Sequence, residues 1–169
     1  EFFALQKHVR NIPPGLARDR PFLSVFLAWA LLHMGREREG VAHLDHARSL
    51  ALDAERESPF TGRTGSILAH EAFLRSILMR LQGDIHDAQK LASEACQSCQ
   101  DNKPFLATSL RSQMAINQFL TGDMDAAEKE LERSMEQAES AEHHLAYFGS
   151  GYTLAEIMVL QGRIDSTHR

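Results

Sequence analysis

The sequence predicts an all-α protein built from antiparallel helix pairs. Four similar segments recur along its 169 residues, and each is centred on a glycine. Small residues stand at fixed distances before and after these glycines. Alternation of apolar and polar residues is nearly absent and β-branched residues are few, so we expect no sheet. The glycines are Gly35, Gly83, Gly122 and Gly162, which lie 48, 39 and 40 residues apart.

The residues around the four glycines form columns that explain how two helices pair. Small residues at fixed offsets let helices approach closely, while leucine and methionine fill the seam. A glycine that ends the first helix supplies a left-handed turn, and Asp84 and Asp123 suit the start of the helix that follows, as N-caps or as acidic residues of its first turn. Counted from each glycine, the columns are Ala28, Ser76, Ala115 and Ala155 seven residues before; His33, Leu81, Leu120 and Leu160 two before; Gly40, Ala88, Ala127 and Thr167 five after; and Ala47, Ala95 and Ser134 twelve after.

Prolines and glycines set the expected element boundaries in chain order. A first helix covers roughly residues 1–11 and ends at the turn 12–15, where two prolines and a glycine cannot continue it. Pro21 and Pro104 stand in the first turn of later helices, a position that proline favours. The loop 58–66, with Ser66 capping the next helix, explains the wide first spacing. The predicted pairs are 21–34 with 37–57, 66–82 with 85–100, 104–121 with 124–140, and 143–161 with a partner that only starts before residue 169.

These boundaries describe one helical-repeat domain over residues 1–169, with hairpins near 21–57, 66–100, 104–140 and 143–169. Because the chain begins with Glu1 and stops inside an expected helix, we interpret it as a fragment of a longer protein. Its net charge of −5 argues against a surface built for nucleic acid. The longest apolar run, 22–34, is shorter than the roughly 20 residues that a membrane span needs, so we expect no membrane partner.

The columns resemble those of the tetratricopeptide (TPR) repeat, in which a small residue is followed by glycine seven residues on and by alanine five and twelve further. The resemblance covers nearly all of residues 22–169 and implies a TPR-like superhelix. The spacing here exceeds the usual TPR period of about 34 residues. The proline that often closes a repeat is also missing, because Leu52, Gln100 and Glu139 stand in its place. The pitch of the superhelix therefore stays open.

Residues 5–35 contain further features that point to one family among the proteins with TPR-like repeats. The features that carry it are Ile12-Pro13, Arg20-Pro21, Leu23, Ala28-Trp29-Ala30 and Gly35, followed by the hairpin segments 81–88 and 120–127. This combination is similar to the sensor part of the MalT-like transcription regulators of the LuxR class. The resemblance implies a bacterial, cytoplasmic protein that binds a small-molecule inducer or a regulatory protein, with self-association as a further option. The alternative is a freestanding TPR-like scaffold that binds peptide or protein partners.

The MalT-like family carries its other activities outside the part that this chain resembles. The resemblance implies that an N-terminal module binds ATP and that a C-terminal helix-turn-helix domain binds DNA. In agreement with this, the chain lacks the G-x-x-x-x-G-K-[ST] motif, so we expect no nucleotide cofactor here. We also expect no enzymatic activity, since no Ser-His-Asp or Cys-His arrangement follows from the residue spacing.

In TPR-like stacks the first helix of each pair lines the concave side, so the resemblance places ligand or partner contacts there. Residues at i, i+4 and i+7 share one helix face. The mixture of apolar and polar side chains on this face suits a small amphipathic ligand or a partner helix. The alternative is that the apolar members, Trp29 above all, belong to the core between hairpins. The candidate binding residues are Trp29, Phe73, Arg80, Ser112, Phe119, Tyr152 and Glu156.

Three other patterns are candidates for chemical sites. Cys96 and Cys99 share a helix face, as do His43 and His46, in spacings that occur at zinc or redox sites. Each pair lacks the further ligands that a metal requires, so we expect no metal. The stretch 62–66, "GRTGS", has the glycines of an anion-binding loop. It lacks the lysine and spacing of a P-loop, so we expect a loop between hairpins.

Overall fold

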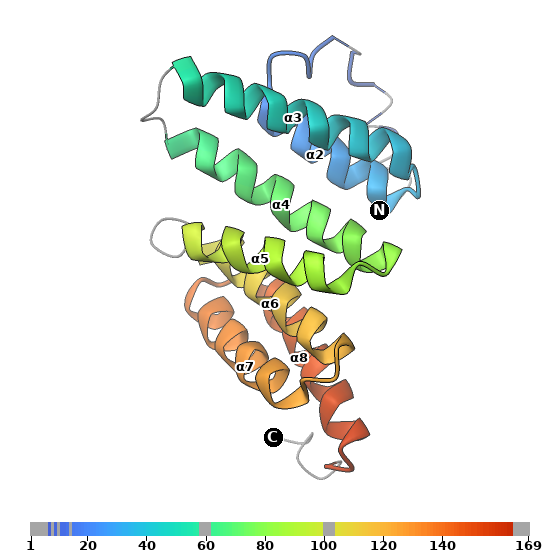
Figure 1. Ribbon diagram of the computed structural model, residues 1–169, viewed down its shortest axis with the longest axis vertical. Coiled ribbons are helices and arrows are strands. Elements are labelled where there is room, and N and C mark those ends of the chain that lie inside the picture. Colours follow the sequence, from blue (N-terminus) through green and yellow to red (C-terminus); the bar gives the residue numbers. More distant parts are fainter. Residues whose placement is uncertain are drawn as a thin grey trace. The chain divides into compact units, whose positions relative to one another are not determined.

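The computed structural model consists of helices joined by turns in its described part, which comprises residues 7, 9, 11–13, 15–57, 62–99 and 104–163 (Figure 1). No strand occurs among these residues, as the sequence predicts. The helices are α2 (Pro21–His33), α3 (Glu37–Glu57), α4 (Gly62–Gln82), α5 (Ile85–Cys99), α6 (Pro104–Leu120), α7 (Met124–Ser140) and α8 (His144–Leu160).

Most predicted helix boundaries agree with the structure to within one residue, and α2 and α6 start at Pro21 and Pro104 as expected. The predicted start of α4 is wrong. This helix begins at Gly62 rather than at residue 66, so Ser66 is not its cap. Ser66 and Ile67 are buried, which anchors the helix at this point despite the low helix propensity of the glycines before it. The predicted first helix, apart from residues 7, 9 and 11, lies outside the described residues, as does the partner helix after residue 163.

The four repeated glycines end helices in the way the sequence predicts. Their φ angles are +71°, +94°, +88° and +73°, in the left-handed region. At each turn the glycine N–H donates to the carbonyl three residues back, and the next N–H donates to the carbonyl five residues back. These two bonds define the Schellman motif. In the third turn the Asp123 carboxylate also accepts from the Ala126 N–H at 3.2 Å, which confirms it as an N-cap.

The chain divides into two compact units, Glu1–Leu74 and Arg75–Arg169, and the division falls within α4. In the first unit α2 packs on α3. Gly40 permits this approach, since a Cβ atom at this position would lie 2.8 Å from Leu32 Cγ and 3.3 Å from the Ala28 carbonyl oxygen. The fully buried Glu71 on α4 accepts from Arg48 Nη1 on α3 at 3.2 Å. In this unit the small residues Ala28, Gly40 and Ala47 of the predicted columns are buried.

In the second unit α5, α6, α7 and α8 pack in succession, and α6 also contacts α8 (Figure 1). Ala115, Ala127, Leu131 and Ile157 form a buried cluster, against which Phe119, Met124 and Leu154 pack. Ser76 is likewise buried, and its hydroxyl donates to the Ala88 carbonyl at 3.0 Å. One repeated column behaves differently, because Leu81, Leu120 and Leu160 are exposed. That column marks surface positions rather than the seam.

Candidate functional site

The structure places the seven candidate residues in both units. Trp29 and Phe73 belong to the first unit. The second unit holds the other five candidates: Arg80, Ser112, Phe119, Tyr152 and Glu156. The seven residues therefore do not all belong to one compact unit.

Arg80 makes the most specific polar contacts of the seven. It lies near the end of α4 and is half-buried, and this burial lowers the pKa of its guanidinium. Its Nη1 atom donates to Gln113 Oε1 and, at 3.5 Å, to Asn117 Oδ1. Gln113 and Asn117 are one turn apart on α6 and therefore share a face. The structure thus brings Arg80 together with two amide side chains of the next helix pair.

Gln113 and Asn117 were not among the residues predicted for the site. Asn117 is fully buried, and its Nδ2 atom has no hydrogen-bond partner among the described residues. A buried amide donor without an acceptor costs free energy, commonly about 1–3 kcal/mol. The sequence did carry a signal for this pair, because two amides at i and i+4 lie on a helix of the predicted concave side.

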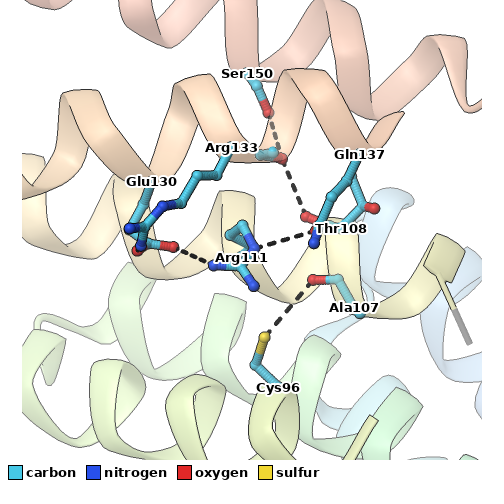
Figure 2. Close-up of polar contacts among 9 residues, drawn as sticks. Cys96, Ala107, Thr108, Arg111, Glu130, Arg133, Gln137 and Ser150 are labelled. Carbon is cyan, nitrogen blue, oxygen red and sulfur yellow. Dashed lines mark hydrogen bonds and ion pairs between the residues drawn. The ribbon is translucent and has the colours of Figure 1, made fainter. Parts of the chain in front are cut away.

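Ser112 lies inside the helix packing of the second unit. It is only 8% exposed, and its Oγ atom is 3.2 Å from Ser150 Oγ on α8. Ser150 Oγ is also 3.0 Å from Ser134 Oγ on α7, and Ser134 donates to the Thr108 carbonyl at 3.2 Å (Figure 2). These small hydroxyl groups satisfy one another where three helices meet. In this arrangement Ser112 contributes to helix packing and is not presented at the surface.

The remaining candidates of the second unit differ in exposure. Phe119 is half-buried against the apolar cluster of the unit. Tyr152 is 68% exposed and forms a side-chain hydrogen bond with Glu156, one turn further along α8. This hydrogen bond, together with the charge of Glu156, raises the pKa of Tyr152. Tyr152 and Glu156 therefore form a polar pair on the surface of α8.

In the first unit Trp29 belongs to a row of rings along α2. Its ring stacks on Phe26, with centroids 6.1 Å apart, and lies 4.4 Å from the ring of His33. Phe26 and Trp29 are both exposed. Phe73 on α4 is half-buried. The exposed rings make α2 the most aromatic surface of this unit among its described residues.

A second polar cluster, between α6 and α7, contrasts with Arg80. Arg111 donates from Nη1 to the Glu130 carboxylate at 2.6 Å and from Nε to Gln137 Oε1 at 3.1 Å (Figure 2). Arg133 donates to the other oxygen of Glu130 at 2.8 Å. Here both arginines share the carboxylate of Glu130, so each of them has an anionic partner, which Arg80 lacks.

The cysteine, histidine and glycine patterns singled out in the sequence lie within helices or at a helix start. The thiol of Cys96 is buried and donates to the Ala107 carbonyl at 3.8 Å, and the side chain of Cys99 lies outside the described residues. His46 Nε2 is 2.9 Å from the Arg18 carbonyl oxygen. Within the described ranges no three His, Cys, Asp or Glu side chains are grouped so that they can hold a metal. The stretch 62–66 forms the start of α4.

Across the helices that the structure describes, none has both the length and the apolar character needed to cross a membrane.

Comparisons with known proteins add no further assignment. No protein-family model matches this chain, and neither a curated protein nor a solved structure shows significant similarity to it.

Proposed function

We propose that this chain is a TPR-like sensor domain of a bacterial MalT-like LuxR-family transcription regulator. It acts in the cytoplasm and binds an inducer or a regulatory protein on the first helices of its pairs. The observation that carries the proposal is the half-buried Arg80, which two amides of α6 hold at the predicted binding face. The repeated Schellman turns and buried small columns support the helical-repeat architecture.

The mechanism we propose is a shift between resting and active assemblies. A ligand shifts such an equilibrium only as far as its affinities for the two states differ. Contacts that bridge two helix pairs, such as Arg80 with Gln113, are suited to this, because a change in pair-to-pair geometry changes them directly. In this proposal the chain performs no catalysis and holds no cofactor, and ATP and DNA bind to domains outside it.

The complete coding sequence tests the regulator proposal at low cost. We expect a P-loop motif on the N-terminal side and a helix-turn-helix on the C-terminal side. Purified full-length protein should then bind ATP and duplex DNA. A complete gene without either domain would overturn the regulator assignment and leave the helical-repeat architecture untouched.

Arg80→Ala tests the sensing role. We expect the thermal stabilisation by an inducer to weaken, while the domain without inducer remains folded. An unchanged response to inducer would remove Arg80 from the site.

The second candidate function is a freestanding scaffold for peptides or proteins. The observation that favours it is the apolar surface of α8, where Phe148, Tyr152, Val159 and Leu160 are all exposed. A scaffold of this kind needs no nucleotide or DNA. Full-length protein that captures a peptide ligand but binds neither ATP nor DNA would support this alternative over the regulator.

A further inference from the structure

Arg80 differs in the chemistry of its partners from the arginines that form ion pairs among the described residues. Arg80 donates to the amide oxygens of Gln113 and Asn117, and no ion pair joins it to a carboxylate in the described part of the chain. Other arginines each contact a glutamate, namely Arg36, Arg48, Arg111, Arg133 and Arg163. Arg80 is thus a half-buried cation whose partners are neutral.

The contacts of Arg80 also leave one edge of its guanidinium unused. A guanidinium carries five N–H donors, and both amide contacts of Arg80 start from Nη1. The edge formed by Nε and Nη2 makes no hydrogen bond to any described residue. This is an edge that can form two parallel hydrogen bonds to a carboxylate or a phosphate. The amides therefore orient the group without occupying that edge.

The energetics favour an anion at this edge. Burial removes water from the Arg80 cation, which lowers its pKa, and neutral amide oxygens compensate a charge only in part. Asn117 Nδ2, fully buried and without an acceptor among the described residues, adds a second unsatisfied donor beside the same guanidinium. An oxyanion would satisfy the charge of Arg80 and several of its N–H groups at once.

The surroundings indicate what the anion is attached to. Gln113 and Asn117 share their face of α6 with Ile116, which is half-buried, and with Leu120, which is exposed. Leu81, next to Arg80, is 76% exposed. An apolar group attached to the oxyanion would contact these apolar side chains and shield them from water.

We propose that Arg80, held by Gln113 and Asn117, binds the oxyanion of an amphipathic organic ligand, either a carboxylate or a phosphate ester. The proposal rests on the sensing role argued above and names the chemical class of its ligand. The apolar part of the ligand lies along Ile116 and Leu120.

The test is a titration of the ¹⁵N-labelled full chain, followed through the Nε–Hε resonance of Arg80. The probes are hexanoate, hexyl phosphate and 1-hexanol, at constant ionic strength. We expect one or both anions to shift the Arg80 resonance saturably, and 1-hexanol to leave it unmoved. Comparison of hexanoate with hexyl phosphate shows whether the site prefers a carboxylate or a phosphate ester. Arg111 is the internal control, because its Nε and Nη1 are already bonded to Gln137 and Glu130.

Two variants make the test specific. Gln113→Glu places a carboxylate beside Arg80 and should weaken anion binding at least about tenfold, or 1.4 kcal/mol, while the melting temperature is kept or raised. The matched control, Gln137→Glu, adds the same charge beside Arg111 and should leave anion binding at Arg80 unchanged.

No saturable shift of Arg80 with either anion would overturn the proposal, as would equal binding by Gln113→Glu and wild type. Either result leaves the sensing role standing if another inducer still stabilises the chain. Conversely, if Arg80 binds the anion but the full-length protein has no helix-turn-helix domain, the proposed anion site stands and the assignment as a transcription regulator is overturned.

Discussion

Four glycines hold the turns of this chain in a backbone conformation that other residues rarely adopt. A left-handed conformation costs a non-glycine residue roughly 1–2 kcal/mol, and asparagine tolerates it better than alanine does. Space is not the constraint at Gly83 and Gly122, since a Cβ atom at either position would meet nothing within 4 Å. The requirement is therefore purely conformational.

Gly122 offers a clean test of this requirement because its φ is +88°. We expect Gly122→Ala to lower the free energy of unfolding by about 1–2 kcal/mol and Gly122→Asn to lower it by less. Urea unfolding followed by circular dichroism, with the slope checked for constancy, measures both. Equal stability of the alanine variant and the wild type would show that the turn relaxes to another conformation.

The buried carboxylate of Glu71 makes a second prediction at residue scale. Its side chain is fully buried, whereas that of its partner Arg48 is 50% exposed. Arg48→Met removes one compensating charge from a group without access to water, so we expect a loss of about 1–3 kcal/mol in the free energy of unfolding. Arg133→Met is the matched control, because Arg133 is 64% exposed and Glu130 keeps Arg111. We expect the control to lose less than about 1 kcal/mol, and a larger loss there than at Arg48 would contradict the argument.

Individual residues show what sequence reasoning reaches and where it stops. The glycine turns and the Asp123 cap follow from local rules, so they were predictable. The exposure of the leucines two residues before the turn glycines was not predictable, because leucine occurs both between packed helices and at the surface. The role of Gln113 and Asn117 depends on which helix lies beside α6, which is a tertiary property. Their spacing alone does not identify Arg80 as the group they hold.

At the scale of elements, helix pairs in this chain are set by how closely two backbones approach. Five residues after Gly35, Gly83 and Gly122 stand Gly40, Ala88 and Ala127, and all three are buried. Gly40 marks the tightest of these contacts, because even a methyl group there would meet Leu32 and the carbonyl of Ala28. The column was predictable as small, but the difference between glycine and alanine within it requires the structure.

Gly40→Ala should therefore destabilise the pair of α2 and α3. The overpacking cost of about 1–3 kcal/mol exceeds the gain of up to about 1 kcal/mol in helix propensity. Gly149→Ala is the matched control, since Gly149 lies in α8 and a methyl group added there would meet nothing within 4 Å. There we expect only the propensity gain, about 0.5–1 kcal/mol. Thermal unfolding separates the two cases by the sign of the change, and stabilisation by both would contradict the close contact at Gly40.

The beginning of α4 shows how tertiary packing changes the extent of an element. Glycine is a poor helix former, and two glycines before Ser66 favour a loop by local rules. In the structure the helix extends back to Gly62, with Ser66 and Ile67 buried inside it. Local propensity amounts to only a few kcal/mol over such a segment, so packing of the buried side chains decides where the helix begins.

For the molecule as a whole, the division into two compact units was not foreseen from the repeats. The division falls within α4, between Leu74 and Arg75, where the pattern of columns is continuous. Repeat proteins owe their stability to each unit and to the contacts between neighbours. The same small residues serve the packing within a repeat and the packing between neighbouring repeats. The sequence period therefore does not predict where the chain divides into compact units.

Two histidines of the described residues, His43 in the first unit and His143 in the second, have protonation that opposes folding. Burial lowers the pKa of His43 in the first unit; the neighbouring His46 lowers it further and Glu39 raises it in part. Burial, followed by the charge of His144, lowers the pKa of His143 in the second unit. For both groups the unfolded chain binds a proton more readily than the folded one. Their contribution is therefore complete above the unfolded pKa, about 6.5, and is lost as the pH falls below it.

We accordingly expect the free energy of unfolding to decrease between pH 7.5 and pH 5.5. Urea unfolding at several pH values within that interval measures the slope, which linkage relates to the excess of protons bound by the unfolded chain. His43→Gln and His143→Gln should each flatten the slope, and the double variant should flatten it most, because it removes both groups. A stability that rises on acidification would show that protonated histidines are favoured in the fold, contrary to their burial.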